Sequence, residues 1–74
     1  MKTEFEIPFV IGSRIRAARQ FRGFFQRELA EKCGCTEGYI SLLEAGKKQP
    51  TLHTLFIIAE ALGCELDIDF KERV

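Results

Sequence analysis

The side chains best suited to reactive chemistry in this chain are three cysteines and one histidine. Cys33 and Cys35 are separated by one residue, Cys64 lies far along the chain, and nothing places His53 near them. A structural metal site takes four such ligands, and this spacing does not assemble them. An odd number of cysteines also argues against a disulfide framework. Each cysteine stands where the apolar pattern calls for a small hydrophobic residue, so we expect structural thiols, no metal and no cofactor.

The sequence contains no catalytic arrangement either. His53 has no nucleophile at a suitable spacing, the carboxylates follow surface positions, and no glycine-rich phosphate loop is present. The 74 residues suffice for one small domain near the limit of independent stability, which a dimer interface would help to stabilise. There is no run long enough to span a membrane and no signal peptide. We therefore expect a single, non-enzymatic, cytoplasmic domain over residues 1–74, with no membrane partner.

Charge is unevenly distributed along a chain whose formal net charge is zero. Residues 13–48 hold eight basic and four acidic side chains, a balance of +4. Residues 49–74 have a balance of −3, and residues 1–12 have a balance of −1. A basic segment of this kind attracts polyanions, and the acidic segment would lie away from such a partner.

The elements that position these residues are mainly short helices. Apolar residues recur at helical spacing from Phe9 to Arg22, and Gly23 ends that helix. Residues 26–45 hold two apolar groups on either side of a Gly-Cys-Thr sequence, which predicts two helices joined by a tight turn. A further helix is expected from Leu52 to Leu62, capped by Thr51 and ended by Gly63. The expected core positions of the last three helices are Leu29, Ala30, Cys33, Ile40, Leu43, Leu55, Ile58, Ala59 and Leu62.

Both ends of the chain change to a period of two. Residues 3–7 alternate charged and apolar side chains, and residues 65–70 alternate Leu66, Ile68 and Phe70 with acidic residues. This alternation predicts short strands near 3–7 and 65–70. Because an isolated strand cannot satisfy its backbone, the strand within 64–71 must pair with residues 3–7, with its own copy in a second subunit, or with both. We expect it to be a dimerisation element.

The stretch QRELAEKCGCTEGYISLLEAGKKQP resembles the lambda-repressor/Cro-type (XRE) family of helix-turn-helix transcriptional regulators. The matching positions are Gln26, Leu29, Ala30, Gly34, Thr36, Ile40, Ser41, Glu44, Gly46 and Pro50. The resemblance extends from about Gly12 to Gly63 and implies a mainly α, four-helix domain whose second motif helix enters the DNA major groove. It also implies a homodimer that binds double-stranded DNA at a palindromic operator, with half-sites about 34 Å apart, as a repressor or autoregulator.

The same resemblance assigns roles to individual residues. The expected base-facing positions on the second motif helix are Thr36, Glu37, Gly38, Tyr39, Ser41 and Leu42. The set holds no Arg, Asn or Gln, the side chains that give bidentate base contacts, so we expect modest selectivity with a contribution from DNA shape. The expected phosphate contacts are Gln26, Arg27, Lys47 and Lys48. Arg19 and Glu44 are expected to form a partly buried ion pair.

Phe25 departs from the family pattern, which places Ser, Thr or Asn at this position. A phenyl ring can neither cap a helix nor contact a phosphate, so the loss should cost about 1 kcal/mol. Two alternative functions stay open. One is an antitoxin whose essential partner is a toxin protein. The other is a protein-interaction module that no longer binds DNA, which the zero net charge and the poor set of base-reading residues would suit.

Overall fold

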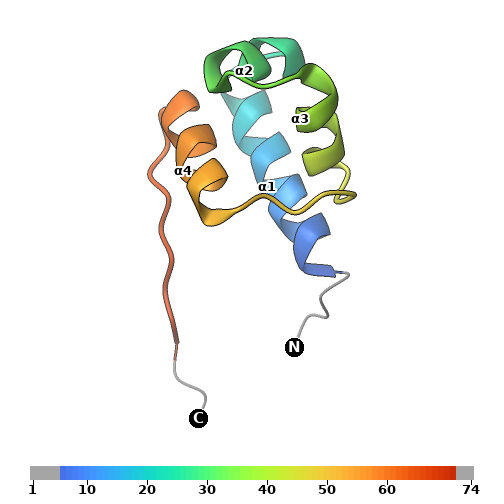
Figure 1. The fold of residues 1–74 in the computed structure, drawn as a ribbon. Helices are drawn as coiled ribbons and strands as arrows, with labels where there is room; N and C mark the ends of the chain where they lie inside the picture. Colours follow the sequence, from blue (N-terminus) through green and yellow to red (C-terminus); the bar gives the residue numbers. More distant parts are fainter. Residues whose placement is uncertain (1–5, 72–74) are drawn as a thin grey trace.

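The computed structural model of this chain describes residues 6–71. They form four helices: α1 (Glu6–Phe21), α2 (Gln26–Cys33), α3 (Glu37–Glu44) and α4 (Leu52–Ala61). In Figure 1, α2 lies across one end of α1, α3 and α4 stand to either side of α1, and extended residues after α4 lead away from the helices. α3 packs against α1 and α2, and α2 also packs against α4. The expected four-helix arrangement is confirmed.

The core is made where the inner faces of all four helices meet. Leu29, Ile40 and Leu43 are almost completely buried, and they come from α2 and α3. Burying a side chain of this size removes apolar surface from water and contributes about 1.5–3 kcal/mol. The remaining buried apolar residues are Ile15, Ala30, Ile58 and Leu62. Helical periodicity had placed the buried residues of α2, α3 and α4 correctly.

The turn between α2 and α3 has the expected geometry. Gly34 has a φ of 71°, the left-handed conformation that glycine adopts without a Cβ clash. The backbone N–H of Cys35 donates to Ala30 O at 3.0 Å and closes the end of α2. Thr36 then caps α3, because its hydroxyl oxygen accepts the backbone N–H of Tyr39 at 3.1 Å. Four consecutive residues thus fix the direction in which α3 leaves α2.

Gly12 brings α1 against the end of α3. The residue is buried, and a Cβ at this position would collide with Leu43 O and lie 2.8 Å from Glu44 O. Only a residue without a side chain allows two backbones to approach this closely. Gly46 makes a second approach, since a Cβ there would lie 2.8 Å from Phe9 Cα. The two glycines hold α3 and the following loop directly on α1.

The predicted strands are not found in the part of the chain that the structure describes. Glu6 and Ile7 are helical, so the strand proposed for 3–7 is wrong at these residues, and residues 3–5 lie outside the described range. Pro8 falls in the first turn of α1, where a missing N–H removes no helical hydrogen bond. With that partner lost, residues 65–70 are extended but belong to no sheet within 6–71. None of the described helices is long and apolar enough to cross a membrane.

Candidate nucleic-acid interface

α3 has one face in the core and one face open to solvent. Ile40 and Leu43 point inward and are fully buried. The five outward positions are all exposed, and they are Thr36, Glu37, Gly38, Ser41 and Leu42. A helix of eight residues is about 12 Å long, which suits insertion into the major groove. The exposed face of α3 is therefore available to a duplex.

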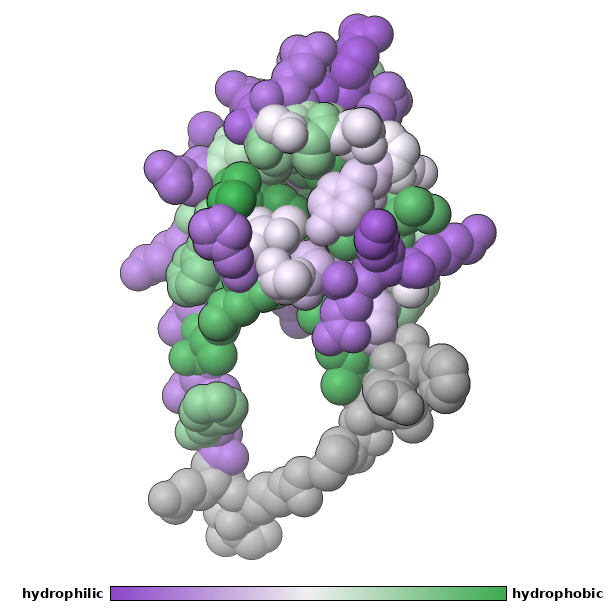
Figure 2. Space-filling view, viewed as in Figure 1, coloured by the Kyte–Doolittle hydropathy of each residue, from purple (hydrophilic) through white to green (hydrophobic). Residues whose placement is uncertain are grey.

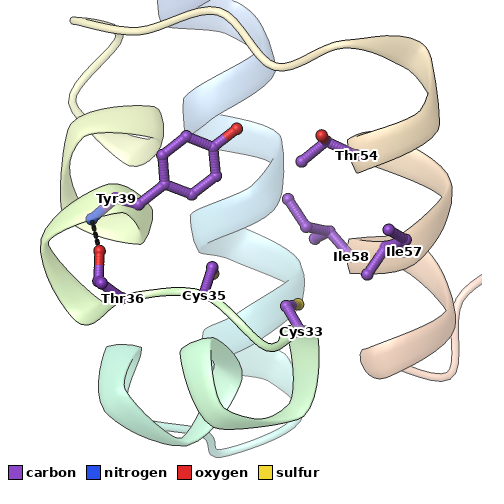
Figure 3. A pocket seen from close by; sticks show the side chains of 7 residues that line it. All are labelled: Cys33, Cys35, Thr36, Tyr39, Thr54, Ile57 and Ile58. Atoms are coloured by element: carbon purple, nitrogen blue, oxygen red, sulfur yellow. Dashed lines mark hydrogen bonds between the residues drawn. The ribbon is translucent and has the colours of Figure 1, made fainter.

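Tyr39 differs from the other predicted base-facing residues. It is half-buried and packs against the core, and its ring points toward α4 rather than away from the domain (Figure 3). The difference arises because Tyr39 lies one residue before the buried Ile40, near the boundary between the two faces of α3. Its position favours support of α3 over direct contact with a base edge.

The basic loop after α3 is exposed and is anchored at both of its ends. Lys47 and Lys48 both lie at the surface, between Gly46, which rests on α1, and Pro50, which is buried. The Lys48 ammonium lies 5.2 Å from the centre of the Tyr39 ring. A cation over an aromatic face at this distance gains about 0.5–1 kcal/mol at an exposed site. The loop therefore presents two positive charges beside the exposed face of α3.

A buried ion pair ties three helices together. Arg19 donates from Nε to Glu44 Oε2 at 2.7 Å and from Nη2 to Glu44 Oε1 at 3.0 Å, a bidentate arrangement. Its Nη1 also donates to Phe24 O at 2.7 Å. The hydrogen bond to Glu44 raises the pKa of the Arg19 guanidinium, more than burial lowers it. The predicted Arg19–Glu44 pair is present and joins the end of α1 to the end of α3.

Gln26 enters the same network, although it was predicted to contact phosphate. Its side-chain amide donates to Glu44 Oε1 at 3.1 Å, so the first residue of α2 is joined to the last residue of α3. Within residues 6–71, no buried side-chain nitrogen or oxygen lacks a hydrogen-bond partner. Breaking this network would leave a charge in a largely dry environment, which costs more than the pair itself gains.

The N-terminus of α2 is only half capped. Phe25 occupies the cap position with a 71% exposed side chain, which offers no oxygen to the helix. The Glu28 carboxylate does accept the Phe25 backbone N–H at 2.9 Å, which is one half of a capping box. Arg27 is exposed beside this terminus. An anion that approaches here would meet the remaining free N–H groups and the positive end of the helix.

The cysteines do not form a metal site. Cys33 and Cys35 are half-buried against the core at an apolar cleft of about 420 Å³ between the α2–α3 turn and α4 (Figure 3). Burial raises the pKa of both thiols, and Cys35 also raises that of Cys33. Cys64 is exposed and not a core residue as its position in the pattern had suggested. The described residues hold no group of three or more side chains that could bind a metal ion.

A capped helix joined through a left-handed glycine to a preceding helix, with its outer face open, defines the helix-turn-helix class of DNA-binding domain. A helix-turn-helix family model matches residues 15–68. The chain belongs to this XRE (lambda-repressor/Cro-type) family of transcriptional regulators.

Known proteins similar to this chain include both sequences and solved structures. The uncharacterized HTH-type transcriptional regulator y4dJ of Sinorhizobium fredii is 37% identical over 54 residues, which cover 73% of this chain and 70% of that protein. The restriction-modification controller protein C.AhdI from Aeromonas hydrophila matches with a TM-score of 0.82 and 26% identity, over 86% of this chain and 93% of that one. A chain of the HipA–HipB–O2–O3 complex matches with a TM-score of 0.72 and 29% identity, over 88% and 92%. Two further relatives are longer, and this chain spans 29% and 39% of their lengths.

Gly12 is the structural residue that the sequence analysis missed. A glycine in the middle of a helical pattern has a packing or functional reason more often than not, so the signal was present. What the pattern lacked was the distance between α1 and α3, which only the assembled fold supplies. The exposed α3 positions and the basic loop do come together on adjoining elements, whereas Gln26 and Tyr39 are engaged within the domain.

Proposed function

We propose that this protein is a sequence-specific DNA-binding transcriptional regulator that binds a palindromic operator as a homodimer and represses its own or a neighbouring operon. The observation that carries the proposal is the exposed outer face of α3, held rigidly by the Arg19–Glu44 pair and the Thr36 cap. Membership of a transcriptional-regulator family supports the same function. In the proposed complex, Thr36, Glu37, Gly38, Ser41 and Leu42 face the base edges.

The proposed phosphate contacts are Arg27 at the start of α2 and Lys47 and Lys48 in the loop after α3. Gln26 can serve as well, because a side-chain amide has two N–H donors and only one hydrogen bond to Glu44 is formed. Contacts of this type position the protein on the duplex without reading its sequence. Few bidentate base readers lie on α3, so we expect a modest preference at each half-site, increased by pairing two half-sites and by DNA shape.

The first experiment is selection from random duplex DNA at near-physiological salt, followed by sequencing of the bound fraction. The proposal expects an enriched palindrome with half-site centres about one helical turn apart. A folded protein that enriches no sequence would contradict it. The recovered operator then becomes the probe for site-directed variants.

The basic loop is tested with the double variant Lys47→Ala/Lys48→Ala. We expect weaker binding to all duplexes and a salt dependence reduced by about one logarithmic unit per lost phosphate contact. The matched control is Arg16→Ala/Lys32→Ala, which removes the same charge from exposed positions on α1 and α2 outside the proposed contacts. Equal losses in the two double variants would mean that only net charge matters and that the loop makes no specific contact.

A second candidate function is that of an antitoxin that binds a toxin protein in addition to DNA. The likeness to a chain of the HipA–HipB–O2–O3 complex supports it. Both functions share the DNA-binding surface, so the discriminating measurement is purification of the tagged protein from its own host. A stoichiometric protein partner favours the antitoxin, whereas the isolated homodimer favours the regulator.

A further inference from the structure

An apolar groove lies between α1 and α4. Its volume is about 330 Å³, within the range of pockets that hold small ligands, and its lining is almost entirely apolar. Ile11 and Ala18 contribute from α1, and Leu55 and Ala59 contribute from α4. α1 and α4 pack less extensively on one another than α3 packs on α1 or α2. The groove therefore leaves apolar surface of the core open along one side of the domain.

The chain itself supplies apolar side chains that have no place to pack. We define residues 64–71 as the C-terminal arm. Leu66 lines the groove and is half-buried, but Ile68 is 53% exposed and Phe70 is 95% exposed. Figure 1 shows the arm continuing past the end of α4 and away from the helices. An extended chain advances about 3.3 Å per residue, so Phe70 lies about 13 Å beyond Leu66. The arm thus carries its largest apolar side chains away from the groove of its own protomer.

Charge on the two surfaces is complementary. Arg14 lines the groove on the α1 side, exposed to solvent. The arm carries Glu65, Asp67 and Asp69, which leave it with a net charge of −2 when Lys71 is included. Within residues 6–71 the one ion pair joins Arg19 to Glu44, so neither Arg14 nor the arm carboxylates are paired inside the described protomer. A second copy of the chain would bring an acidic arm to a basic groove edge, which favours this pairing over other partners.

We propose that two copies of this chain exchange their C-terminal arms, with Ile68 and Phe70 of one protomer seated in the α1–α4 groove of the other and the arm carboxylates beside Arg14. This inference rests on the proposed homodimer and names the surface that forms it. The exchange is reciprocal, so the dimer has two-fold symmetry and the same surface serves both protomers. It accounts for the open groove and for the exposed arm side chains with one interaction.

The test is the dimer dissociation constant of the full chain, measured by sedimentation equilibrium. We expect Phe70→Ser to raise it by about 100-fold, since a large aromatic anchor in a pocket dominates an interface of this size. Ala59→Glu, which places a carboxylate in the groove and against the acidic arm, should have a similar effect. The arm lies outside the core, so Phe70→Ser is expected to keep the monomer folded. The control is Phe56→Ser, which removes an exposed phenylalanine from the part of α4 outside the groove.

Mixing the two monomeric variants gives a sharper result. Phe70→Ser retains an intact groove and Ala59→Glu retains an intact arm, so a heterodimer keeps one of the two arm–groove contacts. We expect the mixture to associate more tightly than either variant alone. Without this rescue, or with a dimer that responds to Phe56→Ser and not to Phe70→Ser, the exchange is wrong. A Phe70→Ser variant that unfolds more readily as a monomer would mean that the arm folds onto its own protomer, which also overturns the proposal.

The same samples separate this inference from the proposed function. Wild-type protein that dimerises through the arms but enriches no DNA sequence contradicts the proposed function and leaves the exchange standing. Wild-type protein that binds a palindrome while its dimer is insensitive to Phe70→Ser overturns the exchange and leaves the function standing. A wild-type chain that stays monomeric at all concentrations overturns the exchange.

Discussion

Replacing Gly12 with alanine is expected to separate α1 from α3. The added methyl group would collide with Leu43 O and lie 2.8 Å from Glu44 O, and both atoms belong to backbone that cannot rotate aside as a side chain can. Overpacking of this kind costs about 1–3 kcal/mol, and the fixed backbone places the cost in the upper half of that range. Alanine regains about 1 kcal/mol of helix propensity. The free energy of unfolding should therefore fall by about 1–2 kcal/mol.

The assay is thermal and urea unfolding of the variant beside a matched control. In a domain of this size, 1 kcal/mol corresponds to a Tm shift of about 4–8 °C, so Gly12→Ala should lower Tm by about 5–15 °C. Gly38→Ala is the control, because Gly38 is also helical and a Cβ there meets nothing within 4 Å. That variant should be as stable as the wild type or slightly more stable. If Gly12→Ala gains stability as the control does, the close contact between α1 and α3 does not exist.

Three further variants test the caps, the ion pair and the thiols. Arg19→Met should cost about 3–5 kcal/mol by stranding the Glu44 carboxylate, and Arg19→Met/Glu44→Met should recover much of it; a double variant no more stable than the single one would contradict this account. Phe25→Ser should add the missing side-chain cap to α2 and stabilise the protein by about 1 kcal/mol in urea unfolding. Burial raises the pKa of Cys33 and Cys35, so their contribution to stability is present below the ordinary thiol pKa of about 8.5 and is lost as pH rises through the folded-state values. A variant with alanine at both positions should lose less stability between pH 8 and 10.5.

Local signals in the sequence were sufficient to predict the four helices. Thr36 and Thr51 are the N-caps of α3 and α4, and Gly34 has the expected left-handed conformation. Each of these features depends on neighbours within about four residues, which the sequence displays directly. The Arg19–Glu44 pair spans 25 residues and was predicted from the family resemblance rather than from the local pattern.

Features that depend on distances between helices were not predicted correctly. The alternation at residues 3–7 suited a strand, but Glu6 and Ile7 extend α1, because the helical pattern after Pro8 continues backward through a first turn that tolerates proline. Gln26 was treated as a free surface residue, and only the folded chain brings it within 3.1 Å of Glu44 Oε1. Tyr39 was placed outward because residues at the edge of an amphipathic helix can face either way, and the position of α4 decides the matter.

The packed core ends at Leu62, and no residue of the arm belongs to it. Residues that hold α3 in place and residues available for self-association therefore occupy separate stretches of the chain. Mutations in residues 67–71 leave the fold of the helices largely untouched, so selection can act on them with little penalty in stability. After a gene duplication, the two copies could diverge in the arm, stop pairing with one another, and still present the same α3 surface. Insulation of sister regulators would then arise from a few changes in a segment that the monomer does not need for folding.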